Sequence, residues 1–378
     1  MNAASGESLP FPRRAFCVAW RFFAVAAAWG AVLRLQVIVP VLPLDYGHML
    51  HAHSHAAFLG WVFNAFVALA LHHFVPNTEQ RAFRALFWLM QVAVLGMLLT
   101  FPFQGYAAAS ISFSTLHLVG GALFAWKLLR RGEASPGARW ALRWAILFLL
   151  LSAAGPLALG PMAVLGMKGT PWYQFAIYFY LHFQYNGWFV FFLLALFLPR
   201  EPTPAATGGA RPSLVAAIHT LAAGCLLTVV LSAWWMGPSS WMFAVAALGG
   251  IAQVVGFVAL VRTRHHLTWF SSPLASGLGL IALLSFTAKI ALQLASALPA
   301  AADLATARPV IIAFLHLVFL GVVTPLLIAW AVELAWLRIR KLATAGLVLL
   351  LLGAAATEVA LFAQPVPALV AVFGAALH

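Results

Sequence analysis

Residues 309–336 read PVIIAFLHLVFLGVVTPLLIAWAVELAW, a stretch that is almost entirely apolar. A helix needs about 20 predominantly apolar residues to cross a bilayer, and this stretch is longer than that. Comparable segments occur along the whole chain, at 15–39, 48–75, 83–102, 108–129, 141–165, 172–198, 213–236, 241–261, 272–298, 309–336, 343–363 and 365–378. The pattern predicts an all-α protein, a polytopic transmembrane helical bundle of about twelve helices.

The composition supports a membrane protein over a soluble one. Hydrophobic residues make up 64% of the chain and charged residues only 8%, whereas a soluble globular domain carries about 25% charge. No polar stretch is long enough for a soluble domain, so residues 1–378 are predicted to form a single transmembrane domain. The clearest linker, residues 200–212, lies between segments 1–6 (15–198) and segments 7–12 (213–378).

The distribution of the basic residues predicts the orientation of the chain. Lys and Arg gather in every second connection between the apolar segments, and the other connections are nearly bare. Basic loops stay on the cytoplasmic side of a membrane, which predicts a cytoplasmic N-terminus in a bacterial inner membrane. The net charge of +13 is spread over loops and forms no broad basic face, so membrane lipid rather than nucleic acid is the expected partner.

Four histidines carry most of the information about function, and each lies early in a different even-numbered apolar segment. Three of them share a local pattern, His55-Ala-Ala-Phe-Leu-Gly60, His182-Phe-Gln-Tyr-Asn-Gly187 and His316-Leu-Val-Phe-Leu-Gly321, and the fourth is His117. An ionisable side chain inside a bilayer is costly and therefore indicates a functional site. All four are predicted about 10–15 Å below the outer surface, which favours a shared haem or metal centre. A separate helix-packing hydrogen bond for each histidine is the alternative.

The segment that begins near residue 48 holds the densest group of histidines. On a helix, His48, His51 and His55 share one face, and His53 points almost opposite. Imidazole suits both copper and zinc, so the first three could hold a metal while His53 serves another centre. A hydrated, histidine-rich helix start without a metal is the alternative.

A haem also needs small residues and cations near it. Gly60 and Gly321 follow His55 and His316, and small residues let a macrocycle lie against the helix backbone. Lys289 and Arg308 are predicted near the same level, where they could pair with the haem propionates.

The run His53-Ser-His55-Ala-Ala-Phe-Leu-Gly60-Trp61 resembles a signature of NnrS proteins, which are twelve-helix membrane proteins that contain haem and copper and are tied to nitric oxide stress. The run also resembles the second helix of the catalytic subunits of haem–copper oxidases and nitric oxide reductases. There, a glycine seven residues after the haem-ligating histidine matches His53 and Gly60.

The resemblance implies a low-spin haem b held by His316 together with His53 or His55. A second metal, copper, could use His182, His117, His48 and His51. Implied partners are quinol or a periplasmic electron carrier, and nitric oxide. Segment 7 lacks the histidine pair of the oxidases, and His316 is followed by Leu317 and Val318 rather than by a second ligand, so a complete oxygen-reducing centre is not predicted.

The sequence leaves the function open between several classes. The first is a haem protein in respiratory electron transfer or nitric oxide handling, which could be an oxidoreductase. A metal or small-solute transporter, or an assembly protein that handles cofactors for an oxidase, are the alternatives. A transporter is less favoured because nearly all the acidic residues lie at loops or helix ends.

Overall fold

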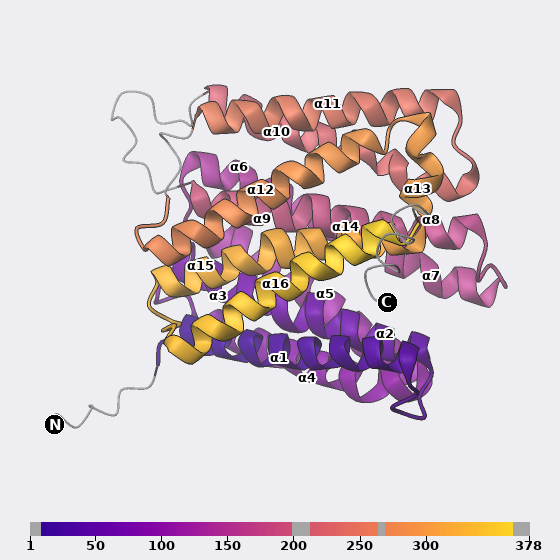
Figure 1. Cartoon of the computed structure of the whole chain (residues 1–378). Coiled ribbons are helices and arrows are strands. Elements are labelled where there is room, and N and C mark those ends of the chain that lie inside the picture. The colour runs from indigo at the N-terminus through magenta and orange to yellow at the C-terminus, as the bar shows by residue number, and fades with distance from the viewer. Residues whose placement is uncertain (1–8, 199–211, 264–268, 366–378) are drawn as a thin grey trace. The chain divides into compact units, whose positions relative to one another are not determined.

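The computed structural model describes residues 9–198, 212–263 and 269–365, and these residues are helical with no strand among them (Figure 1). Each of the first eleven predicted segments is a helix or a run of consecutive helices. All but the first residue of the predicted segment 365–378 lies outside the described residues. The prediction of an all-α polytopic bundle is confirmed.

Ten helices within the described residues are long and apolar enough to cross a membrane. The predicted segment 172–198 is helical but is not among these ten. Its middle carries His182, Gln184 and Asn186, which lower its hydropathy. The chain is a multi-pass membrane protein, and this helical stretch has polar residues in its middle.

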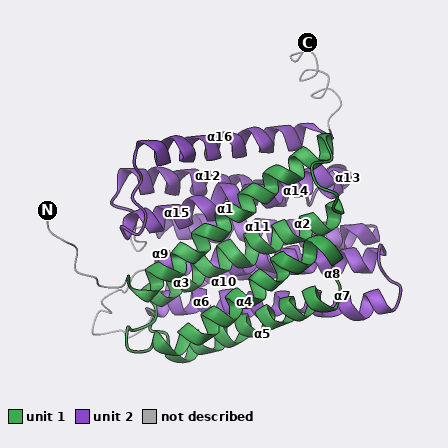
Figure 2. Ribbon diagram, turned by 90° about the horizontal axis from the view of Figure 1, so that it is seen from below, with its two compact units in different colours: residues 1–134 green, residues 135–378 purple. Residues whose placement is uncertain are grey.

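The chain divides into two compact units, residues 1–134 and residues 135–378 (Figure 2). This boundary follows the fourth predicted segment, whereas the sequence pattern placed its linker at 200–212. All of that linker except Pro212 lies outside the described residues. The single domain over 1–378 stays a prediction, and each unit is described by itself below.

Unit 1 contains four long helical stretches. They are α1 (Phe11–Ile38), the continuous run of α2 (Tyr46–His55), η1 (Ala56–Phe63) and α3 (Asn64–His73), then α4 (Arg81–Gln104) and α5 (Ala108–Arg131). Within the unit, α4 packs along α5, and α1 packs along η1 and α3. The run from α2 to α3 contacts both α1 and α4 and carries the histidine cluster.

Unit 2 holds the remaining described helices. They are α6 (Pro136–Ser152), α7 (Ala154–Val164), α8 (Pro171–His182), η2 (Phe183–Phe189), α9 (Val190–Phe197), α10 (Pro212–Thr228), η3 (Val229–Met236), α11 (Ser240–Arg262), α12 (Pro273–Ala295), η5 (Pro299–Ala301), α13 (Ala302–Thr306), α14 (Arg308–His316), η6 (Leu317–Val323), α15 (Thr324–Glu333) and α16 (Lys341–Ala363). The closest pair is α10 and α11, which lie side by side (Figure 1).

A π-helix follows the histidine in each copy of the repeated pattern. The elements η1, η2 and η6 are π-helices that begin at Ala56, Phe183 and Leu317, directly after His55, His182 and His316. His117, which lacks the pattern, lies within the uninterrupted α5. The shared sequence pattern therefore corresponds to a shared local conformation. Single-turn π-helical bulges occur frequently at functional sites.

Candidate functional site

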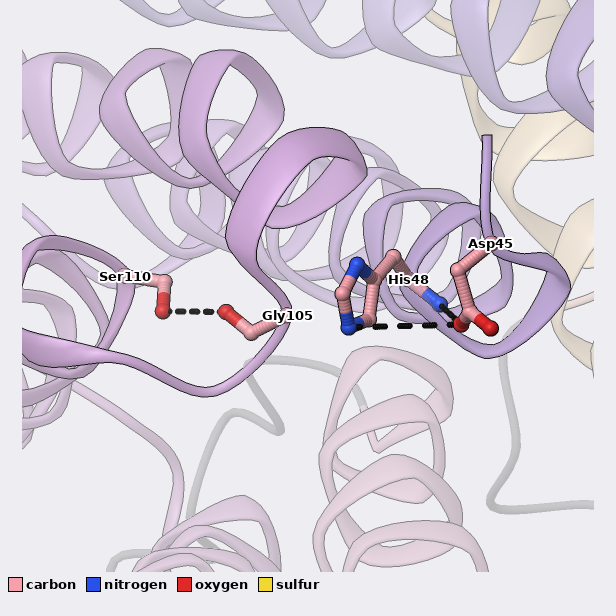
Figure 3. Close-up of polar contacts among 4 residues, drawn as sticks. All are labelled: Asp45, His48, Gly105 and Ser110. Atoms are coloured by element: carbon pink, nitrogen blue, oxygen red, sulfur yellow. Dashed lines mark hydrogen bonds and ion pairs between the residues drawn. The ribbon is translucent and has the colours of Figure 1, made fainter. Parts of the chain in front are cut away.

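His48 lies at the first turn of α2, against the residue that caps this helix. The side chain of Asp45 accepts a hydrogen bond from the backbone N–H of His48 at 2.9 Å, and the Nε2 atom of His48 lies 4.0 Å from the same carboxylate oxygen (Figure 3). In the α4–α5 turn of the same unit, the hydroxyl of Ser110 donates to the carbonyl of Gly105 at 2.6 Å (Figure 3). The N-cap therefore fixes the backbone at His48, and the imidazole lies near the same carboxylate.

His51 and His55 lie one turn apart on the same face of α2. The Nδ1 atom of His55 is 2.8 Å from the carbonyl oxygen of His51. Since a carbonyl can only accept, Nδ1 carries the proton and Nε2 carries the lone pair. The His55 ring packs on Phe101, and the His51 ring meets Tyr106, with ring centroids 4.4 and 4.6 Å apart.

His53 leaves α2 toward α1. Its Nδ1 atom donates to the carbonyl oxygen of Ala26 at 2.9 Å, so Nε2 again carries the lone pair. A Cβ atom at Gly30 would lie 3.2 Å from the His53 ring, and the glycine therefore lets α1 approach this closely. This hydrogen bond joins α2 to α1, as the alternative hypothesis of a helix-packing histidine expects.

His117 is buried in α5, and one of its side-chain nitrogens has no hydrogen-bond partner among the residues that the structure describes. The residue is 3% exposed, and its Nε2 atom has no hydrogen bond within the described part of the chain. Its ring packs against Phe63 with centroids 5.0 Å apart, and it lies close enough to His55 to interact with it electrostatically. Unit 1 therefore brings together imidazoles from α2 and α5.

Three or more metal-binding side chains do not gather around any point in the described residues. The expected metal set of His48, His51, His55, His117 and His182 is divided, because His182 belongs to unit 2 and the other four to unit 1. Within unit 1, His48 faces Asp45 while His55 faces the aromatic side chains. Copper at these residues stays a prediction.

Both ring nitrogens of His182 are engaged inside unit 2. Its Nε2 atom donates to the carbonyl oxygen of Cys225 at 2.8 Å, and its Nδ1 atom lies 3.1 Å from the side-chain Nδ2 atom of Asn186. Because Nε2 carries the proton, Nδ1 accepts from the Asn186 amide. These bonds account for His182 as a residue that joins the end of α8 to α10.

A chain of polar side chains continues from that carbonyl to Lys289. The Thr228 hydroxyl lies 3.3 Å from the Cys225 carbonyl oxygen, Gln253 donates to Thr228 at 2.9 Å, and Lys289 donates to Gln253 at 3.0 Å. Lys289 is 1% exposed. Its expected role beside a haem propionate stays a prediction, and the structure gives it an amide partner on α11.

The other predicted haem residues lie in both units. Arg308 is the exposed first residue of α14, and His316 is the last residue of that helix. These two belong to unit 2, whereas His53 and His55 belong to unit 1. The pairing of His316 with His53 or His55 stays a prediction.

Helix packing accounts for the glycines of the repeated pattern. A Cβ atom at Gly60 would lie 2.7 Å from the Phe22 ring, and one at Gly321 would lie 2.7 Å from the Ser285 hydroxyl. At Gly187 it would lie 2.5 Å from Phe148. In each case the backbone of the π-helix is in contact with a neighbouring helix, so the space beside the glycine is filled by protein.

The sequence prediction did not include several residues of the polar chain. Gln253 and Asn186 are buried polar side chains within apolar segments, and such residues mark helix contacts or functional sites in membranes. Both amides are visible in the sequence as polar residues within apolar segments.

No protein-family model matches this chain, and no curated protein matches it. The fold defines the class of protein, a polytopic all-α membrane protein with imidazoles buried in both of its units.

Proposed function

We propose that this protein is an integral membrane haem protein that carries low-spin haem b and serves in electron transfer or nitric oxide handling. The observation that carries the proposal is the neighbouring pair His55 and His117 in unit 1. One nitrogen of His55 is anchored on a backbone carbonyl, and Nε2 of His117 is buried without a partner in the described residues. An unsatisfied buried nitrogen costs about 1–3 kcal/mol, which binding of a metal would offset.

The histidine side chains of this site are suited to ligate haem iron. Histidines that bind a metal almost always donate their other ring N–H to a carbonyl, a carboxylate or water, and both His55 and His53 do so. Each therefore presents the lone pair of Nε2. A haem at these nitrogens would supply one-electron redox chemistry.

The surroundings of the pair would support such a group. Phe101 and Tyr106 pack at His55, and Phe63 packs at His117. Apolar side chains around a haem exclude water and lower the local dielectric, and both effects tune the reduction potential. Quinol or a periplasmic electron carrier is the proposed source of electrons.

The test is the spectrum and haem content of the purified full-length protein. The wild type is expected to show a sharp reduced α-band and about one haem per chain. His55→Leu and His117→Leu are each expected to lose most of this haem, because each removes a ligand. His219→Leu is the matched control, since His219 accepts a hydrogen bond from Trp144 at 2.9 Å in unit 2 and is no proposed ligand.

The other variants separate the possible ligand sets. Loss of haem in His53→Leu and His316→Leu, with full retention in His117→Leu, would replace the proposed pair by the pair that the resemblance implies. Elemental analysis of a His48→Ala, His51→Ala double variant tests for copper, which should fall while haem stays unchanged. A wild-type protein that binds no haem after expression with added haem precursor would end the proposal.

A further inference from the structure

Unit 2 contains a cavity of about 240 Å³ at the end where α8, η3, α12, α13 and α14 meet. This volume is just below the usual range of ligand pockets, about 300–1,000 Å³. Most of the lining is aliphatic or aromatic, and its polar side chains come from α8, η2, η3, α13 and the C-terminal end of α12. The lining includes Tyr178, His182, Asn186, Trp234, Trp235 and Gln293.

Two residues in the cavity wall have side-chain oxygens without a hydrogen-bond partner in the described part of the chain. They are Asn186 and Gln293, which are 6% and 3% exposed. The orientation of the Asn186 amide follows from its neighbour: His182 donates through Nε2 to a carbonyl, so its Nδ1 must accept the Asn186 N–H. The Asn186 oxygen is thereby left to accept from something other than His182.

A buried donor lies in the same wall. The indole N–H of Trp234 is buried and has no acceptor among the described residues. A hydroxyl group both donates and accepts, so a single hydroxyl can satisfy an amide oxygen and an indole N–H together. A ligand with acceptors alone, such as a ketone or an ether, would leave both amide oxygens unsatisfied.

The charge near the cavity disfavours cationic ligands. Lys289 lies close enough to His182 to interact with it electrostatically, and no salt bridge to Lys289 is present in the described part of unit 2. An ammonium ligand could use the two amide oxygens, but the buried lysine would repel it. A neutral donor is therefore favoured.

The apolar part of the wall fits an aromatic ring. Tyr178 and Trp235 stack with centroids 5.3 Å apart and planes 13° apart, and the Ser232 hydroxyl donates to the Tyr178 carbonyl at 3.2 Å. These contacts hold a flat aromatic surface between α8 and η3. Aromatic rings pack on such surfaces in offset or edge-to-face arrangements.

We infer that this cavity binds a neutral, lipid-soluble molecule that carries a hydroxyl group on an aromatic ring, with the hydroxyl proton donated to one of the two amide oxygens, that of Asn186 or that of Gln293. Phenols with an alkyl tail belong to this class, and so do hydroquinones. The inference concerns binding only and does not depend on the haem of unit 1.

The test measures saturable binding of 4-hexylphenol to the full-length protein in lipid nanodiscs, with empty nanodiscs subtracted. The matched probe is 4-hexylanisole, which has the same ring and tail but no hydroxyl proton. The phenol is expected to bind at least tenfold more tightly. Of the variants Gln293→Leu and Asn186→Leu, the one that removes the accepting oxygen is expected to weaken phenol binding about threefold to tenfold, the usual range for one lost hydrogen bond; unchanged binding in both would contradict the inference.

Two further variants keep the result interpretable. Thr287→Val lies on the same helix as Gln293 but is exposed outside the cavity, and it should bind like the wild type. Ala305→Phe adds a bulky ring to the cavity wall and should abolish binding while leaving the haem content of unit 1 unchanged. Equal binding of the two probes, or unchanged binding in Ala305→Phe, would overturn the inference even if the haem proposal holds.

Discussion

Asn64 and Gln91 are buried inside unit 1 and bond reciprocally to each other. Asn64 donates to the Gln91 oxygen at 2.8 Å, and Gln91 donates to the Asn64 oxygen at 2.9 Å. Each amide also donates to a carbonyl one turn earlier on its own helix. Both side chains therefore join α3 to α4 through hydrogen bonds. A buried histidine can have the same structural role.

Asn64→Leu is expected to lower the free energy of unfolding by about 1 kcal/mol, because it leaves the Gln91 amide buried without its partner. The double variant Asn64→Leu, Gln91→Leu should recover part of that loss, since neither position then holds an unpaired polar group. Unfolding in a series of detergent mixtures, followed by circular dichroism, measures both. If the loss of stability in the double variant equals the sum of the losses in the two single variants, the two side chains are not coupled and the prediction is wrong.

At the scale of elements, the π-helices pack closely against neighbouring helices. In η1 the backbone at Gly60 touches Phe22 of α1, and in η6 the backbone at Gly321 touches Ser285 of α12. A π-helix inserts one residue into the helical turn and so changes which faces point inward before and after it. The histidine before each bulge and the core residues after it can therefore both face the interior.

Gly60→Ala is expected to destabilise unit 1 by about 1–3 kcal/mol, because the added methyl group would overpack the contact with Phe22. Gly346→Ala is the matched control: this glycine lies in α16 with nothing within 4 Å of the added Cβ atom. It should be neutral, or stabilising by up to about 1 kcal/mol, since alanine favours helix. Thermal unfolding of both variants in the same detergent makes the comparison, and a destabilised Gly346→Ala would remove its basis.

At the scale of the whole molecule, the basic loops predict which connections face the cytoplasm. Val41 and Leu165 lie in exposed connections that are poor in basic residues, and Asn77 lies in a connection flanked by Arg81 and Arg84. In a variant with Cys17 and Cys225 replaced by alanine, Val41→Cys and Leu165→Cys should react with a membrane-impermeant maleimide on intact cells. Asn77→Cys should react only after permeabilisation. The reverse labelling would invert the predicted orientation.

The positions of the helices could be predicted because a membrane-spanning helix must satisfy its own backbone hydrogen bonds within one apolar segment. Predictions for segments such as 83–102 and 108–129 therefore agree closely with α4 and α5. The helical stretch at 172–198 was also predicted, and Pro199 marks its end in the sequence. The shared His-x4-Gly pattern was visible as well, although its π-helical conformation was not.

The sequence alone determined that the chain is a helical membrane protein and which imidazoles lie inside its apolar segments, since both follow from local composition and period. Only the tertiary structure decided what each imidazole contacts: His182 with a carbonyl and an amide, His53 with α1, and His55 near His117. Helical periodicity tells which residues share a face, but the partner of that face is chosen by packing between segments far apart in the chain.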